Sequence, residues 1–298
     1  MRDSAKAPLY QNDPILRYYR ASRWDYELLW MSAKARDMHF GYWDETVKNH
    51  EASLLKMNEV LATRANILAS DRVLDVGCGF GGSALWLARN IGCHVMGVNI
   101  VSEQIESAER LVRRESLERR VEFRCTDFTA LDLRDESFDV VWAMESLLHF
   151  ENREDFFRKA WRLLRENGRL VIADYVWTDS APLKGQEAAM AQEWFEGWAM
   201  RRMLSAKEYE PIVKSCGFSG VVVEDISKYV IPSLKRLKNI TRVTVPLATA
   251  AYALRCIPKE RLGNARASAL HFDTFKRGLW RYWLIFAAKS RNVLFNES

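Results

Sequence analysis

The chain has 298 residues, of which 48% are hydrophobic and 28% are charged, so it is long enough for one large or two modest globular domains. Its net charge of +5 comes from acidic and basic residues that are interleaved along the sequence, which does not indicate a dedicated nucleic-acid-binding protein. The five cysteines have no C-x-x-C spacing and the N-terminus has no apolar signal segment, so we expect reduced thiols and a cytoplasmic location.

The N-terminal segment, residues 1–69, predicts a helical cap. Residues 1–13 are polar, and helices are expected over residues 25–34 and 51–68. An aromatic segment, residues 39–43 (HFGYW), lies between these helices and is expected to act as a hinge.

Residues 71–177 alternate between short apolar segments and helical segments. Helices are expected over residues 82–90, 103–114 and 155–165, with Ser102 and Asn152 as N-caps. Strands are expected over residues 72–76, 93–98, 121–125, 138–144 and 169–176. This alternation predicts an α/β fold with a doubly wound, mostly parallel sheet.

The C-terminal sequence adds two strands, so the expected sheet has seven. They lie over residues 221–223 and 283–287, and helical insertions at about 180–204 and 232–278 are expected to form a lid. Together these elements predict one domain over residues 70–298.

Two local patterns refine this C-terminal prediction. Ser205 and Glu208 have the spacing of a capping box at the start of a further helix. The longest uncharged apolar stretch lies between Arg242 and Arg255, and it is too short to cross a bilayer.

A glycine loop follows the first expected strand and is the most informative part of the sequence. Asp75 stands two residues before Gly77, and glycines recur at positions 79, 81 and 82. Glycine allows positive φ and close approach to a ligand, and the start of the next helix offers free N–H groups to a carboxylate or a phosphate. A dinucleotide-binding loop more often has its acid at the end of the second strand, where this chain has Asn99.

Taken in order, the strand ends resemble those of the class I S-adenosylmethionine-dependent methyltransferases. The loop VLDVGCGFGG (residues 73–82) is similar to that family's first motif, and E-S-x-x-H at residues 145–149 is similar to the γ-tocopherol, antibiotic-sugar and prenyl methyltransferases. The hinge HFGYW is also similar to that group. The resemblance implies a Rossmann-like methyltransferase fold over residues 70–298 and S-adenosylmethionine as the cofactor.

The resemblance also implies a role for residues at each strand end. The aminoacyl part of the cofactor would contact Asp75, Gly77, Cys78 and Gly79. The ribose would lie beside Asn99, which stands where many relatives have an acid, and Gln104. Asp127 would accept from the adenine amino group and Phe128 would pack against the ring. The remaining contacts would come from backbone at Met144 and from a cover made by Tyr18 or Tyr19 with the hinge around His39 and Tyr42.

Three residues are candidates for catalysis. Glu145 and His149 stand four apart, so one helical turn would direct both into the same cleft, and His149 has a suitable ordinary pKa for a general base. Asp174, at the end of the fifth strand, is similar in position to an active-site acid of the sugar methyltransferases. Leu148 replaces the first of two adjacent histidines that those enzymes often have, which favours a more apolar acceptor than a sugar.

Several large apolar side chains indicate an apolar acceptor of the terpenoid, quinone or alkaloid type. The methyl group would be transferred to a carbon or an oxygen atom of this acceptor. The expected lid contains residues 243–248 together with Trp177, Trp194, Phe195 and Trp198. A prenyl diphosphate C-methyltransferase is a specific hypothesis, in which Glu145 removes a proton. The diphosphate would then be held by basic residues among Arg17, Arg20, Lys235, Arg236 and Lys238.

Other functions stay open. A sugar or alkaloid O- or N-methyltransferase is the nearest alternative, and a non-catalytic binding protein on the same fold is another. A nucleic-acid methyltransferase is disfavoured because the fourth strand ends in MESLLH rather than an N/D-P-P-Y motif. No metal-ligand spacing is present among the His and Cys residues, and the apolar lid could touch a membrane surface or a second subunit of a homo-oligomer.

Overall fold

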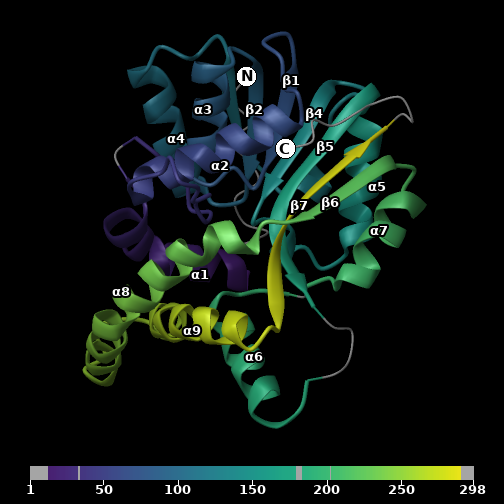
Figure 1. Cartoon of the computed structure of the whole chain (residues 1–298). Coiled ribbons are helices and arrows are strands. Elements are labelled where there is room, and N and C mark those ends of the chain that lie inside the picture. Colours follow the sequence, from purple (N-terminus) through teal and green to yellow (C-terminus); the bar gives the residue numbers. More distant parts are fainter. Residues whose placement is uncertain (1–12, 33, 179–182, 202, 290–298) are drawn as a thin grey trace.

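In the computed structural model, a seven-stranded sheet carries helices on both faces (Figure 1). The structure describes residues 13–32, 34–178, 183–201 and 203–289. The strand order is β3-β2-β1-β4-β5-β7-β6, and β7 runs antiparallel to both of its neighbours. The predicted fold class is therefore confirmed. The strands are β1 (Arg72–Val76), β2 (His94–Asn99), β3 (Val121–Cys125), β4 (Phe138–Met144), β5 (Leu164–Trp177), β6 (Ser219–Asp225) and β7 (Trp280–Ala288).

Helices follow the strands in the alternation that the sequence predicts. Before and among the first five strands lie α1 (Pro14–Asp25), the π-helical turn η1 (Tyr26–Trp30), α2 (His50–Arg64), α3 (Gly82–Asn90), α4 (Ser102–Arg114) and α5 (Arg153–Leu163). Two 3₁₀ turns follow β3 and β4, namely η2 (Phe128–Ala130) and η3 (Leu147–His149). The later helices are α6 (Gly185–Gly197), α7 (Ala206–Ser215), α8 (Ser227–Ala253) and α9 (Lys259–Lys276).

The two faces of the sheet bury separate apolar clusters. Alternate residues of β4 point to opposite faces, so Trp142 joins the cluster under α2, α3, α6, α8 and α9, and Val141 joins the cluster under α5 and α7. Because the central strands are covered on both sides, most of their residues are apolar. Among the described residues, no helix is long and apolar enough to cross a membrane.

The described part of the N-terminal segment divides between two places. Helix α2 packs on α3, and its Met57 and Leu61 are fully buried in the core of the sheet. Helix α1 packs instead on α9, beside the C-terminal helices (Figure 1). Only α1 and η1 therefore resemble the cap that was expected over residues 1–69, while residues 1–12 lie outside the described residues.

Several predicted boundaries are wrong. No α-helix covers residues 25–34, because the helix begins at Pro14, where Asp13 caps it, and a single π-turn follows Asp25. Ser102 is the first helical residue rather than the N-cap, a position that Val101 holds. The expected cap at Asn152 and the capping box at Ser205 are confirmed.

Candidate active site

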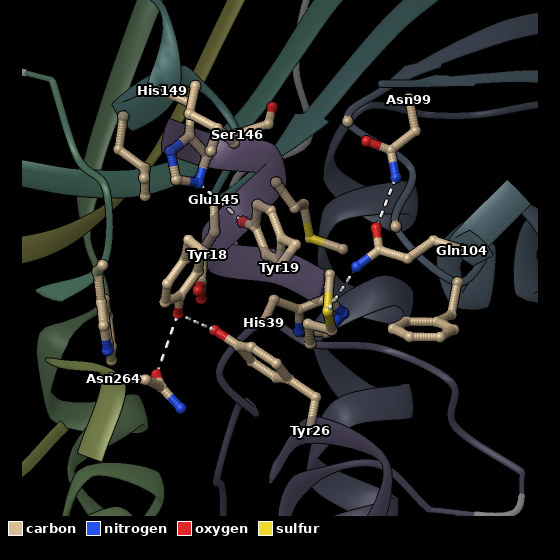
Figure 2. A pocket seen from close by; sticks show the side chains of 18 of the residues that line it. Tyr18, Tyr19, Tyr26, His39, Asn99, Gln104, Glu145, Ser146, His149 and Asn264 are labelled. Atoms are coloured by element: carbon tan, nitrogen blue, oxygen red, sulfur yellow. Dashed lines mark hydrogen bonds between the residues drawn. The ribbon is translucent and has the colours of Figure 1, made fainter. Parts of the chain in front are cut away.

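A large cavity opens at the carboxyl ends of β1, β2, β3 and β4, beneath α1, η1, α8 and α9 (Figure 2). Its volume is about 790 Å³, within the range of small-molecule sites. Carboxyl ends of parallel strands meet at one edge of a sheet, which is why residues far apart in sequence share this cavity. Apart from Tyr42, the residues expected to contact or cover a cofactor line it: Tyr18, Tyr19, His39, Asp75, Gly77, Cys78, Gly79, Asn99, Gln104, Asp127, Phe128 and Met144.

The glycine loop leaves β1 with a backbone that other residues would strain. Gly77 has φ of 78°, and a Cβ atom there would lie 2.5 Å from Cβ of Ser146, in the loop after β4. Gly81 caps α3 with φ of 82°. The absence of side chains at both positions keeps the loop close to its neighbours and leaves the start of α3 directed at the cavity.

Asp75 is the buried acid at the end of β1. Its side chain is 3% exposed, and its Oδ2 atom has no hydrogen-bond partner. Burial, with a smaller contribution from the carboxylate of Asp37, raises the pKa of Asp75 to about 8. A buried acceptor of this kind fits a ligand that brings a cationic N–H group to it.

Asp37 and His39 lie beside Asp75, and only His39 belongs to the aromatic hinge that the sequence predicts. The carboxylate of Asp37 accepts hydrogen bonds from the Ser83 hydroxyl and the Asn58 amide. Nε2 of His39 lies 3.4 Å from Oδ1 of Asp37. Burial alone would lower the pKa of His39, but the adjacent Asp37 carboxylate reverses this and raises it. The only sequence signal for this cluster is its position just before and within the aromatic hinge.

The hinge residue Tyr42 lies elsewhere. Its ring stacks on Tyr229 of α8 with centroids 4.1 Å apart, and it is absent from the cavity lining. The expectation that Tyr42 covers the site is therefore corrected: this part of the hinge holds α8 in place.

Amide side chains occupy the cavity edge after β2. Asn99 donates through Nδ2 to Oε1 of Gln104 at 2.6 Å, and Asn99 Oδ1 accepts from the Ile100 backbone at 2.9 Å. Figure 2 shows this pair on one side of the cavity, with Tyr19 between it and His149. An amide pair offers both donors and acceptors to neighbouring hydroxyl groups.

Asp127 and Phe128 line the cavity after β3. Oδ1 of Asp127 accepts from the backbone and the hydroxyl of Thr129, which fixes the start of η2. Phe128 is 3% exposed and packs on Phe156 with ring centroids 5.2 Å apart. Phe128 therefore belongs to the core and to the cavity wall at once.

A tyrosine cluster covers the cavity from α1 and η1. The hydroxyl of Tyr18 lies 2.6 Å from that of Tyr26, and it donates to Oδ1 of Asn264 on α9 at 3.1 Å. The same asparagine donates to Asp25 at 3.1 Å. Figure 2 shows Tyr26, Tyr18 and Asn264 of this chain on the lid side. Sequence reasoning missed Tyr26 and Asn264, which carry no motif.

His149, on the η3 turn, has both ring nitrogens engaged. Nδ1 lies 3.2 Å from the carbonyl oxygen of Ala199, and Nε2 lies 2.7 Å from the hydroxyl of Tyr19. A carbonyl oxygen only accepts, so Nδ1 carries the proton and Nε2 is the acceptor, facing Tyr19 and the cavity. Burial lowers the pKa of His149 to about 4, so the ring is neutral at ordinary pH.

Glu145, between β4 and η3, also lines the cavity. Its carboxylate accepts from the Phe40 backbone at 2.7 Å, from the Tyr175 hydroxyl at 2.5 Å and from the Tyr282 hydroxyl at 2.8 Å. Burial raises its pKa although these three donors oppose the shift. Its own φ of 48° is rare for a residue with a side chain. Glu145 thus ties the hinge, β5 and β7 together beneath the cavity.

The structure changes the expected role of Asp174. This residue is 1% exposed and is not among the residues that line the cavity. Its two oxygens accept from the backbone N–H groups of Leu147 and Tyr175. Burial raises its pKa to about 7. Asp174 therefore supports the η3 turn that carries His149 and has no direct access to a ligand.

Some of the residues expected in the lid line the cavity, and others are buried away from it. Trp198 lines the cavity, whereas Trp194 is fully buried against Trp280 and His271. Trp177 and Phe195 pack on the edge of the same cluster. From residues 243–248, the cavity is lined by Thr244, Leu247 and Ala248.

The five basic residues suggested for a diphosphate do not line the cavity. Arg20 pairs with Glu103, Lys238 pairs with Asp273, and Arg236 donates to the Leu29 carbonyl. Arg17 lies near Glu260, and Lys235 is exposed on α8. The cations in the lining are Arg36, Arg201 and Arg261. Among the described residues, no cluster of three or more His, Cys, Asp and Glu side chains could hold a metal ion.

Comparison with known proteins identifies the family. Residues 74–172 match the family described as "Methyltransferase domain". Methyltransferase GfsG of Streptomyces halstedii is 32% identical over 259 residues, covering 85% of this chain and 87% of that protein. The chain is a class I S-adenosylmethionine-dependent methyltransferase. A second relative, the 27-O-demethylrifamycin SV methyltransferase of Amycolatopsis mediterranei, is 34% identical over 197 residues. The match covers 66% of the present chain and 72% of that relative.

Solved structures share the fold of this methyltransferase. Geranyl diphosphate C-methyltransferase from Streptomyces coelicolor A3(2) superimposes with a TM-score of 0.71 at 19% identity, covering 96% of this chain and 100% of that one. The [4+2]-cyclase SpnF superimposes with a TM-score of 0.67 at 24% identity, covering 85% of this chain and 87% of that one. The resemblance stated from the motifs is confirmed: the enzyme uses S-adenosylmethionine and methylates a small-molecule acceptor.

Proposed function

We propose that this methyltransferase methylates a hydroxyl oxygen of a large, mostly apolar natural product, with His149 as the general base. The observation that carries the proposal is the pair of contacts that fixes Nε2 of His149 as an unprotonated acceptor facing the cavity. When bound, S-adenosylmethionine supplies a methyl group that is activated by its positive sulfonium centre.

Cofactor binding is assigned to the sheet side of the cavity. Asp75, whose Oδ2 atom is buried and unpartnered, would accept from the ammonium group of the aminoacyl part, beside the glycine loop. Asn99 and Gln104 would bind the ribose hydroxyls, and Asp127 with Phe128 would hold the adenine ring. All of these residues line one continuous cavity, which supports the assignment.

Acceptor binding is assigned to the lid side. Apolar side chains of η1 and α8 lie there beside the polar groups of Tyr18, Tyr26, Asn264 and Arg261. An acceptor hydroxyl would take the place that the Tyr19 hydroxyl holds beside His149, and its proton would pass to Nε2 as the oxygen receives the methyl group. Neutral His149 can accept this proton at once because burial keeps it uncharged.

Carbon methylation of an isoprenoid is the second candidate. A sterol 24-C-methyltransferase of Saccharomyces cerevisiae is 30% identical over 217 residues, although this chain covers only 55% of its length. In that reaction Glu145 would remove the proton, but three donors already hold its carboxylate. The geometry therefore favours His149 and oxygen. The prenyl diphosphate version has less support still, because the five basic residues suggested for the diphosphate lie outside the cavity lining.

The test uses methyl-labelled S-adenosylmethionine with hydroxylated macrolides, ansamycins, sterols and geranyl diphosphate. Nuclear magnetic resonance of the product shows whether the new methyl group is on oxygen or carbon. We expect an O-methyl product and a kcat at least about 100-fold lower in His149→Gln. The exposed residue His94 supplies the matched control His94→Gln. A C-methyl product, or full activity in His149→Gln, would refute the proposal.

A further inference from the structure

Helix α8 carries an exposed apolar stripe along its outer half. Val243, Leu247, Ala250 and, just after the helix, Leu254 follow at intervals of four, three and four residues, which places them on one face. The exposed fractions of the three large side chains are 62%, 64% and 75%. Apolar side chains gathered in this way on a protein surface mark an interaction site.

A basic stripe runs beside the apolar one. Lys228, Lys235 and Arg242 repeat every seven residues, and all three are exposed. Every charged residue between Asp225 and Glu260 is basic. Lys235 and Arg242 have no carboxylate within ion-pair distance among the described residues, so their charges face outward uncompensated.

The apolar stripe reaches the mouth of the cavity. Leu247 belongs to the stripe and also lines the cavity. Leu29, on η1, lines the cavity and is 37% exposed, and Arg236 of α8 donates to its carbonyl oxygen. Figure 1 shows the far end of α8 and the start of α9 at the outer edge of the molecule, away from the sheet.

We propose that the exposed face of α8 docks on an anionic lipid surface, with the apolar stripe of its outer half inserted and the basic stripe on the headgroups. An apolar face flanked by cations, without acids, is the pattern of helices that lie in a membrane interface. Because the mouth of the cavity opens at this face, an apolar acceptor dissolved in the lipid enters directly. That consequence rests on the proposed apolar acceptor, whereas the docking itself does not.

Charge favours lipid over a second copy of the chain. An antiparallel two-fold contact through this face would place the basic stripes of both copies on the same side, and like charges in a contact are unfavourable. An anionic surface instead neutralises the basic stripe.

The test is flotation of the purified enzyme with vesicles, with no cofactor or acceptor present. We expect binding to vesicles that contain phosphatidylglycerol, weak binding to phosphatidylcholine alone, and loss of binding at high salt. Lys235→Gln with Arg242→Gln lowers the partition coefficient roughly 25-fold, at about fivefold per charge. Leu254→Asp lowers it about tenfold or more.

Matched controls make the same changes away from α8. Arg110→Gln with Arg119→Gln removes two exposed positive charges in and after α4, and Leu68→Asp changes a leucine that is 50% exposed after α2. These variants should float like the parent enzyme. The proposal is overturned by absence of flotation, by unchanged flotation of the α8 variants, or by a dimer in sedimentation that Leu254→Asp disrupts without any lipid binding.

The docking and the proposed function fail separately. Vesicle binding without any O-methyl product would remove the proposed reaction and leave the docking surface. Methylation of a detergent-dispersed acceptor without vesicle binding would remove the docking surface alone.

Discussion

Asp75 combines burial with an oxygen atom that has no partner, and this combination makes the protein sensitive to pH. In the folded chain its pKa is about 8, whereas an unfolded chain has about 3.9 for aspartate. Between these values the native state binds more protons than the unfolded state. The contribution of Asp75 to the unfolding free energy therefore falls as the pH rises from about 4 to about 8.

The substitution Asp75→Asn tests this sign. Without cofactor, we expect the variant to lose less unfolding free energy than the parent protein between about pH 5 and about pH 8, because the amide carries no charge to bury. Urea unfolding at the two pH values measures the difference. The same variant should bind S-adenosylhomocysteine more weakly in isothermal titration, since the acceptor for the ammonium group loses its charge. A parallel fall of stability in both proteins would contradict the assigned pKa.

His149 predicts the pH dependence of the reaction. Its pKa is about 4, against an ordinary value near 6.5, so the neutral base is already present well below neutral pH. With cofactor and acceptor saturating, we expect kcat to stay level from about pH 7.5 down to about pH 5.5, where an unshifted histidine would lose most of its activity. Stopped assays across this range measure the profile. A decrease centred near 6.5 would show that His149 is solvated during turnover.

Asp174 is the group whose titration must be told apart from that of His149. Its pKa is about 7, and it holds the η3 turn through backbone N–H groups. The plot of kcat against pH could show an inflection near pH 7. If His149→Gln keeps this inflection in its residual activity, the inflection belongs to Asp174 and the turn, since that variant lacks the proposed base.

At the scale of the elements, the loop from β1 to α3 depends on Gly81. Its φ is 82°, and a Cβ atom would lie 2.7 Å from Cζ of Phe123 and 2.9 Å from Cβ of Ala108. Gly81→Ala should lower the unfolding free energy by about 2–4 kcal/mol, because steric overlap adds to backbone strain. Gly185→Ala is the control, since its φ is also positive at 55° but no atom lies within 4 Å. That variant should lose only about 1 kcal/mol. Equal losses in urea unfolding would show that overlap contributes nothing.

The elements themselves were largely predictable because each has its own periodic apolar pattern. Strands β1 to β5 and the helices between them were expected near their observed positions, and parallel topology predicts that the strand-end residues meet at one edge of the sheet. The cofactor roles proposed for those residues came from the family resemblance. The π-turn at Tyr26–Trp30 was not predictable, since nothing in the local sequence pattern distinguishes it from an α-helix. Strand β5 begins earlier than expected because Leu164 pairs with Phe138, a contact that only the assembled sheet provides.

The side-chain contacts around Glu145 and His149 were not predictable, because they too form only in the assembled fold. The residues Glu145 and His149 were found from a motif, but Tyr175, Tyr282 and the Ala199 carbonyl reach them from β5, β7 and the segment after α6. Ala199 has φ of 50°, a conformation that no sequence signal marks for alanine. The proposal that His149 rather than Glu145 acts as the base rests on these long-range contacts.

At the scale of the whole molecule, the Asp25 carboxylate is a main attachment of the segment formed by α1 and η1 to the lid. Oδ1 of Asp25 accepts from Nε and Nη2 of Arg261 at 3.0 and 2.9 Å, and Oδ2 accepts from Nδ2 of Asn264 at 3.1 Å. The segment carries Tyr18 and Tyr19 over the cavity, so its opening exposes the proposed base. Elements held by few contacts open more readily than the core of a sheet.

Substitution of that carboxylate should loosen the cover without disturbing the sheet. In Asp25→Asn, we expect amide hydrogens of α1 to exchange about tenfold faster, because hydrogen bonds to a charged group are lost, while those of β4 keep their rates. Hydrogen–deuterium exchange with mass spectrometry measures both in one experiment. Glu59→Gln, which changes an exposed acid on α2, is the control. Bound S-adenosylhomocysteine should slow exchange in α1 of the parent enzyme, since Tyr18 and Tyr19 would then pack against it. If neither the substitution nor the ligand changes the exchange rates in α1, this segment is a fixed wall of the cavity. Acceptors must then enter past α8 instead.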